Sequence, residues 1–153
     1  MTGRADLHQQ FAGRFHAGKR PRAATEEQIA DAETALGVLF PESYRQFSLN
    51  HGAVNAPSLL DLVVAKKSGF SDVQQFLKPK QMVTETRRWH LSPEGGGMAF
   101  AADSSGNWFM FRGLTNSSPR PDDAAVWLFD LETGEPTLQA DSFDKWIEGF
   151  LGL

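Results

Sequence analysis

The segment FAADSSGNWFMFRG, residues 100–113, places two short aromatic runs on either side of a polar centre. Runs of this length and composition are typical of β-strands. The polar centre, Asp-Ser-Ser-Gly-Asn at 103–107, supplies the side-chain hydrogen bonds and the positive φ angle that a tight turn needs. We therefore predict an antiparallel hairpin here, and not a catalytic or metal-binding loop.

The pattern downstream of this hairpin predicts a second hairpin and then a helix. Residues 125–130 (AVWLFD) and 136–140 (PTLQA) flank the turn sequence LETGE at 131–135. In the last segment, apolar residues recur at helical spacing after Ser142, which is a suitable N-cap residue. The C-terminal half is thus predicted to hold four short antiparallel strands and a terminal helix.

Two helices joined by a tight connection are predicted upstream. Thr25 can cap a helix over 25–36 because Gln28, three residues further on, completes a capping box. Gly37 supplies the left-handed residue that ends this helix. A second helix is predicted over residues 41–50, since it begins at a proline that suits a first helical turn and ends before a glycine.

The segment between these helices and the hairpins predicts one strand and two further helical pieces. Residues 58–65 (SLLDLVVA) form an apolar, partly β-branched run that is typical of a strand. Residues 71–90 contain a capping residue, an interrupting Pro79 and apolar residues at roughly helical spacing. They predict a short turn of helix followed by a longer helix.

Residues 1–24 differ in charge from the rest of the chain. They carry five cations against one acid, and Leu7, Phe11 and Phe15 follow one another at i+4 steps. This pattern predicts a basic, amphipathic N-terminal arm and linker that docks loosely on an acidic body formed by residues 25–153. The body has ten cations against 18 acids, so its net charge is −8.

The charge and composition also limit the partners and the location of the protein. Residues 89–153 hold three cations against ten acids, a field that repels nucleic acid and attracts a basic protein. An acidic surface that serves only solubility is the alternative explanation. The chain has no cysteine, no secretory signal and no apolar stretch near the roughly 20 residues of a membrane helix. We therefore expect a cytoplasmic protein with no membrane partner and no direct contact with nucleic acid.

The sequence gives little support to catalysis. The four histidines, His8, His16, His51 and His90, lie outside any serine-nucleophile or zinc-binding motif. The turn that contains Asp103 resembles a fragment of a calcium loop but lacks the remaining spaced carboxylates. We expect no catalytic residue, no cofactor and no metal ligand. A hydrolase that uses Asp103 and His51 is the least favoured alternative.

Several individually weak motifs follow one another in a specific order between residues 25 and 151. They are the Leu36-Gly37 to Phe40-Pro41 junction with Tyr44, the helix end at Asn50 to Gly52, Phe100-Ala101-x-Asp103 leading to Gly106-Asn107, Val126 to Asp130, and Ser142-Phe143. In this order they resemble the SUKH superfamily, which is named partly after yeast regulators of cell-wall glucan synthesis. The resemblance implies a single α+β domain over residues 25–153. In such a domain a curved antiparallel sheet of four or more strands is packed by N-terminal helices and a C-terminal helix.

The same resemblance implies a function. Bacterial members of the superfamily are taken to be immunity proteins of polymorphic or contact-dependent toxin systems, which bind and neutralise a cognate toxin. The chain departs from the family pattern at Arg112, where an aspartate is common, and in the basic segment before Thr25. A regulatory scaffold or adaptor, as in eukaryotic relatives, is the alternative, with the basic arm as its docking segment.

Together these observations predict an immunity protein that blocks a basic toxin, such as a nuclease, by acidic occlusion. Trp108, Trp127 and Phe129 alternate with core positions, and we expect packing in the core for them; exposure of some of them on the open sheet face is the alternative. The partner-binding residues that we predict are acids of the C-terminal half, namely Asp122, Asp123, Asp130, Glu132, Glu135, Asp141 and Asp144.

Overall fold

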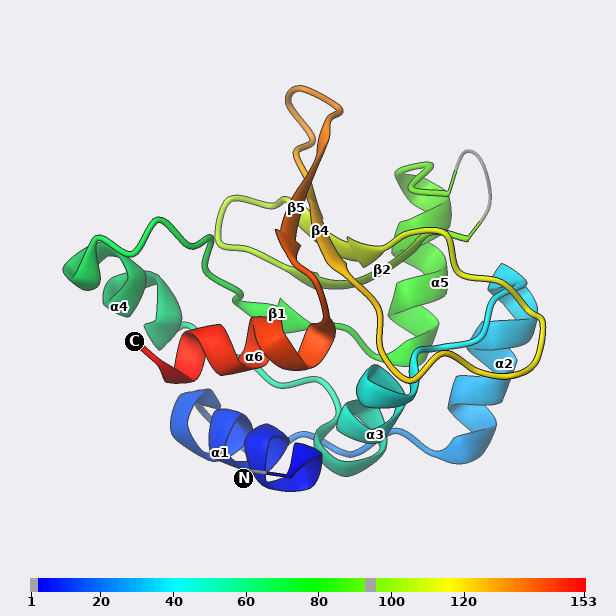
Figure 1. The fold of residues 1–153 in the computed structure, drawn as a ribbon, viewed down its shortest axis with the longest axis horizontal. Coiled ribbons are helices and arrows are strands. Elements are labelled where there is room, and N and C mark those ends of the chain that lie inside the picture. Colours follow the sequence, from blue (N-terminus) through cyan, green and yellow to red (C-terminus); the bar gives the residue numbers. More distant parts are fainter. Residues whose placement is uncertain (1–2, 93–95) are drawn as a thin grey trace.

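The computed structural model describes residues 3–92 and 96–153. Within these residues, six helices and a five-stranded antiparallel sheet form an α+β domain, which confirms the predicted fold class (Figure 1). None of the helices in this part of the chain is long and apolar enough to cross a bilayer. The elements are α1 (Arg4–Phe15), α2 (Glu26–Leu36), α3 (Glu42–His51), α4 (Ser58–Lys66), β1 (Gln75–Phe76), α5 (Pro79–Arg88), β2 (Met98–Ala102), β3 (Trp108–Phe111), β4 (Val126–Phe129), β5 (Pro136–Ala140) and α6 (Phe143–Leu151).

The sheet follows the order of the chain, β1-β2-β3-β4-β5, and each strand is antiparallel to its neighbours. The hairpin predicted at residues 100–113 is confirmed. Asp103 Oδ1 accepts hydrogen bonds from the backbone N–H groups of Ser105 (2.9 Å) and Asn107 (2.8 Å), and Gly106 has a φ of 87°. Asp103 therefore stabilises the turn itself.

The predicted helix ends are also confirmed. Thr25 and Gln28 form the reciprocal hydrogen bonds of a capping box at the start of α2, and Gly37 ends that helix with a φ of 68°. Gly52 ends α3, and a Cβ at this position would collide with the carbonyl oxygen of Arg22. Ser142 caps α6 by accepting a hydrogen bond from the backbone N–H of Lys145.

The prediction of a strand at residues 58–65 is wrong, because this segment forms α4. Leu59 is fully buried, but Leu60 is 40% exposed and Val64 is 66% exposed. An apolar run of eight residues cannot be assigned to a strand or a helix by its periodicity alone. Here the segment lies at the edge of the domain, where a helix satisfies its own backbone groups without a neighbouring strand.

The short helical turn predicted near residue 71 is also wrong. Residues 71–74 are irregular, and residues 75–76 form β1, in which Phe76 pairs with Ala101 and is fully buried. Pro79 does not interrupt a helix but begins α5, where its missing N–H group leaves no unpaired donor. Tertiary pairing with β2 therefore overrides the local pattern of this segment.

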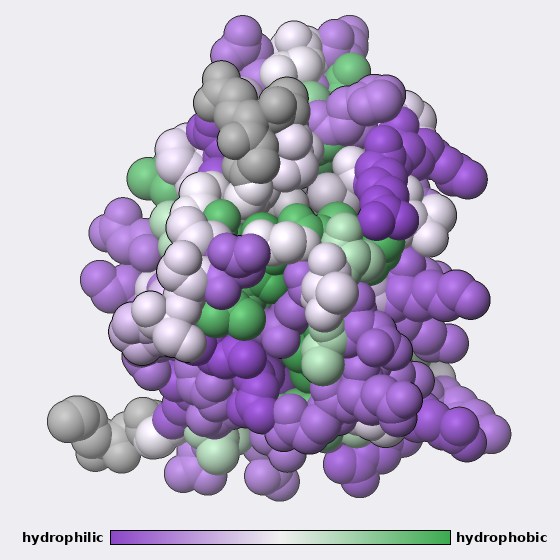
Figure 2. Space-filling view, turned by 90° about the vertical axis from the view of Figure 1, so that its right-hand side faces the viewer, coloured by the Kyte–Doolittle hydropathy of each residue, from purple (hydrophilic) through white to green (hydrophobic). Residues whose placement is uncertain are grey.

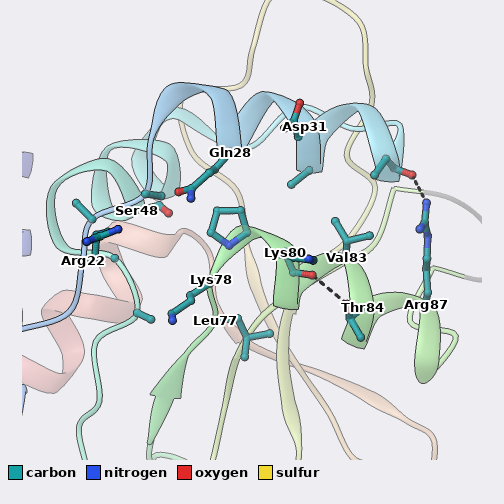
Figure 3. Close-up of a pocket in the computed structure, with 17 residues that line it drawn as sticks. Arg22, Gln28, Asp31, Ser48, Leu77, Lys78, Lys80, Val83, Thr84 and Arg87 are labelled. Carbon is teal, nitrogen blue, oxygen red and sulfur yellow. Dashed lines mark hydrogen bonds between the residues drawn. The ribbon is translucent and has the colours of Figure 1, made fainter.

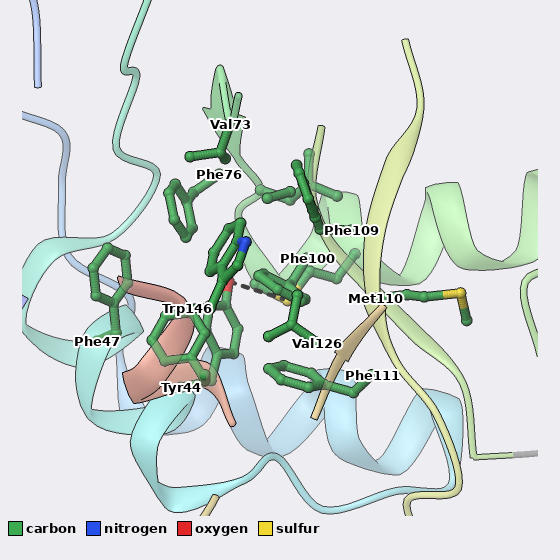
Figure 4. Close-up of a cluster of buried hydrophobic side chains, with 14 of the residues drawn as sticks. Tyr44, Phe47, Val73, Phe76, Phe100, Phe109, Met110, Phe111, Val126 and Trp146 are labelled. Carbon is green, nitrogen blue, oxygen red and sulfur yellow. Dashed lines mark hydrogen bonds between the residues drawn. The ribbon is translucent and has the colours of Figure 1, made fainter. Parts of the chain in front are cut away.

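Aromatic side chains from α3, the sheet and α6 meet in the core (Figure 4). Tyr44 lies within this core, and its ring is within 6 Å of the rings of Phe100, Phe111 and Phe143. Its hydroxyl donates to the sulfur of Met82 at 3.9 Å. Complete burial raises the pKa of Tyr44, so this hydroxyl stays protonated.

α1 packs into this same core, more closely than the loose docking that we expected of residues 1–24. Phe11 is fully buried, and its ring contacts those of Phe47, Phe76 and Phe150 at centroid distances of 5.9–6.2 Å. Figure 1 shows α1 lying alongside α6 and α3. The division of the chain into an arm of residues 1–24 and a domain of residues 25–153 stays a prediction.

Candidate partner-binding surface

The strand register collects aromatic and aliphatic side chains on the sheet face opposite to the core. Directly paired residues in an antiparallel sheet lie on the same face. One row of pairs joins Met110, Trp127 and Leu138 across three strands, and a second row joins Trp108, Phe129 and Pro136. We call these six residues the outer sheet face.

The core lies on the other side of these strands, because Phe109, the neighbour of both Trp108 and Met110, packs on Trp146 of α6 at 4.8 Å. α5 packs against β2, where Thr86 Oγ1 accepts a hydrogen bond from the backbone N–H of Ala99 (2.9 Å), and Met82 of α5 reaches the core. Towards β5 the outer sheet face opens to solvent, since Leu138 is 47% exposed and Trp127 is half-buried. The expectation that Trp127 packs in the core is therefore only partly met.

Arg112 covers the middle of this face. The carbon atom of its guanidinium lies 4.8 Å above the ring of Trp127, a distance typical of a cation–π contact. Arg112 is the departure from the family pattern noted in the sequence, and an aspartate at this position would not make this contact. Arginine and tryptophan are enriched among residues that dominate the free energy of protein association. The departure from the family pattern thus places an arginine on a tryptophan of the outer sheet face.

Three of the predicted acids lie at the turn between β4 and β5, beside the outer sheet face. Glu132 and Glu135 are exposed, whereas Asp130 accepts hydrogen bonds from the backbone N–H groups of Glu132 (2.8 Å) and Thr133 (3.4 Å). Figure 1 shows this turn projecting away from the helices. We call Asp130, Glu132 and Glu135 the acidic tip.

Two further predicted acids are neutralised from within the chain. Arg4 Nε lies 2.7 Å from Asp144 Oδ2, and an Arg4 terminal nitrogen lies 2.8 Å from Asp122 Oδ2. His8 Nε2 contacts Asp144 Oδ1 at 2.8 Å. Burial raises the pKa of Asp144, but hydrogen bonds from His8 and Arg4 outweigh it and lower the pKa overall. The hydrogen bond from Arg4 likewise lowers the pKa of Asp122. These carboxylates hold α1 against α6.

Asp123 has a structural role as well. Its Oδ1 accepts hydrogen bonds from Ser43 Oγ (2.7 Å) and from the backbone N–H of Phe143 (2.8 Å), which joins the start of α3 to the start of α6. Asp141 is exposed just before α6. The four acids Asp122, Asp123, Asp141 and Asp144 therefore lie at one end of β5 and the acidic tip at the other. A five-residue strand separates them by about 16 Å, so the seven acids form two groups.

A comparison of the chain with known families finds a match that covers most of this domain. A family model described as the SMI1 / KNR4 family (SUKH-1) matches residues 23–149. The chain belongs to this family. The SMI1 / KNR4 match begins in the linker before α2 and ends within α6, so it includes the outer sheet face and the acidic tip. α1 lies outside the SMI1 / KNR4 match. The comparison with curated proteins found no match.

The two residues of the hydrolase alternative have separate structural environments. His51 ends α3 with its ring against that of Phe47, at a centroid distance of 5.4 Å. Asp103 belongs to the turn between β2 and β3. Within residues 3–92 and 96–153, no hydrogen bond or ion pair joins His51 to Asp103. Burial, aided by the charges of His8 and Arg20, lowers the pKa of His51 to about 4.

His51 should make the protein less stable in mild acid. Between pH 6.5 and about 4, the unfolded chain binds a proton at this histidine that the folded protein does not bind. The free energy of unfolding therefore falls as the pH falls through this window. After allowance for partial exposure of the ring, we expect a loss of about 1 kcal/mol between pH 7 and pH 5.

Urea unfolding at these two pH values measures the effect. His51→Gln should remove most of the loss, while the same change at the exposed His90 should leave it in place. An equal loss in the wild type and in His51→Gln would show that another group causes the pH dependence.

Proposed function

We propose that this chain is an immunity protein that binds and neutralises a cognate toxin, through the outer sheet face and the acidic tip. The partner that we infer is a basic protein that acts on nucleic acid and is encoded beside this chain. The chain acts in the cytoplasm, without catalysis, by covering the surface that the toxin needs for its substrate. Membership of the SMI1 / KNR4 family is consistent with this role.

The observation that carries the proposal is the position of one exposed and two half-buried apolar side chains next to acids that form no ion pair with the described residues. Leu138, Trp127 and Phe129 offer apolar surface at the open edge of the sheet. Glu132 and Glu135 lie at the turn that follows Phe129, and no ion pair involves them in the part of the chain that the structure describes. Protein interfaces commonly combine an apolar centre with a polar rim.

The acids and the apolar side chains have different roles in the proposed binding. Acids at the rim attract a basic partner and speed association, and salt screens this effect. Apolar and arginine anchors that become buried on binding slow dissociation. A toxin that binds nucleic acid offers cations where its substrate phosphates bind, so the acidic tip can occupy the place of those phosphates.

Charge reversal at the acidic tip tests the electrostatic part of this proposal. The double variant Glu132→Lys/Glu135→Lys should lower the association rate with the protein encoded by the adjacent gene by about tenfold at low salt. The difference from the wild type should shrink at 0.5 M salt because the charges are then screened. Surface plasmon resonance at several salt concentrations measures both effects.

The matched control reverses two exposed acids elsewhere, Asp61→Lys/Glu148→Lys. It makes the same change in net charge on α4 and α6, outside the outer sheet face and the acidic tip. An equal loss of association rate in both double variants would mean that net charge acts alone and that the acidic tip has no special part.

A further inference from the structure

A groove of about 780 Å³ lies between α2 and α5, on residues that belong neither to the outer sheet face nor to the acidic tip (Figure 3). Small and aliphatic residues form its floor, among them Ala32 and Ala35 of α2 and Val83 of α5. Figure 2 views the side of the molecule on which α2 and α5 lie, and it shows hydrophobic surface in a hollow framed by hydrophilic side chains. A groove of this volume accommodates a few side chains of a ligand.

The rim of this groove is basic. Arg22, Lys78, Lys80 and Arg87 line it together with a single acid, Asp31, so the lining has a net charge of +3 in a chain whose net charge is −4. None of these four cations forms an ion pair with another described residue. Cations that are gathered around apolar surface, in a chain that is otherwise acidic, indicate a ligand that carries both negative charge and apolar groups.

Two features keep positive charge at the groove. One terminal nitrogen of Arg87 donates a hydrogen bond to the carbonyl oxygen of Ala35 (3.0 Å), which fixes the guanidinium across the gap between α5 and α2 (Figure 3). α5 begins at the groove with Lys78 and Pro79, so the positive end of its helix dipole adds to the charge of the side chains.

We propose that this groove binds an acidic segment of a protein partner, in which carboxylates flank apolar side chains. The carboxylates pair with the cations of the rim, and the apolar side chains lie on the alanine and valine floor. Single-stranded nucleic acid fits less well, because its recognition uses aromatic side chains on which bases stack. The lining of the groove contains no phenylalanine, tyrosine or tryptophan. This binding site goes beyond the proposed toxin-binding function, since the two surfaces share no residue.

The experiment uses the full chain and three fluorescein-labelled probes, followed by fluorescence anisotropy at 50 mM salt. The first probe is a peptide of six glutamates around two leucines, the second replaces the glutamates with lysines, and the third is an eight-nucleotide DNA strand. We expect binding of the glutamate peptide alone. Lys78→Ala/Lys80→Ala should weaken it by about tenfold, as expected for the loss of two ion pairs at a surface.

Two further variants separate the groove from overall charge. Lys66→Ala/Lys145→Ala removes two exposed cations outside the groove and should change the affinity by less than about twofold. Val83→Asp places a carboxylate in the floor of the groove and should abolish binding. The thermal unfolding of each variant is measured in parallel, to show that each variant is folded. The proposal is overturned if the glutamate peptide does not bind, or if the control double variant weakens it equally. The proposal is also overturned, in favour of a nucleic-acid site, if the DNA strand binds more tightly than the glutamate peptide and Lys78→Ala/Lys80→Ala removes this binding.

Discussion

Replacing Phe11 with alanine should lower the free energy of unfolding by about 3–5 kcal/mol, the range for a fully buried phenylalanine. Phe11 has no exposed surface, and its ring contacts α1, α3, β1 and α6. The expected loss is a large share of the total stability of a domain of this size, about 5–15 kcal/mol. α1 is therefore expected to be part of the folding unit, although it precedes the region that matches the family.

Urea unfolding followed by tryptophan fluorescence measures this effect. Gln10→Ala, at an exposed position of the same helix, serves as the control and should change stability by less than about 0.5 kcal/mol. A loss below about 1 kcal/mol in Phe11→Ala would instead support loose docking of residues 1–24. The result also bears on the adaptor alternative, in which residues 1–24 are the docking segment. If α1 is part of the folding unit, deletion of residues 1–24 would remove part of the core together with any docking segment.

Replacing Trp127 with alanine should weaken binding of the cognate toxin by about 30-fold or more, which corresponds to about 2 kcal/mol. The substitution removes the central side chain of the outer sheet face and the ring on which the Arg112 guanidinium lies. Because Trp127 is only half-buried in the free protein, we expect a smaller effect on stability than on binding.

Isothermal titration calorimetry with the protein encoded by the adjacent gene measures the affinity. Trp89→Ala is the matched control, since Trp89 is 42% exposed at the end of α5 and lies outside the outer sheet face. Affinity that is unchanged in Trp127→Ala, or that falls equally in both variants, would place the toxin on another surface.

Local signals in the sequence predicted the elements whose ends are determined by neighbouring residues. The capping box of Thr25 and Gln28, the turn at residues 103–107 and the N-cap at Ser142 each depend on contacts within five residues. Residues 58–65 and 71–77 were predicted wrongly because their conformation depends on position in the fold. One segment lies at the edge of the domain, and the other pairs with β2.

The candidate site could be predicted only in part, for the same reason. Charge counting singled out the acids of the C-terminal half, but it could not show that Arg4 pairs with Asp122 and Asp144, which lie more than 100 residues away. The alternation of Trp127 and Phe129 with core positions was visible, whereas their exposure depends on what covers the sheet. The groove had no sequence signal at all, because its cations come from the linker before α2 and from the start and end of α5.

The most direct test of the proposed function combines binding with inhibition. The intact chain is mixed with the protein encoded by the adjacent gene, and the complex is measured by size-exclusion chromatography while the activity of that protein on nucleic acid is followed. The account predicts an equimolar, salt-sensitive complex in which activity is lost, and recovery of activity when Trp127→Ala is combined with Glu132→Lys/Glu135→Lys. Absence of a complex, or full inhibition by this triple variant, would contradict it.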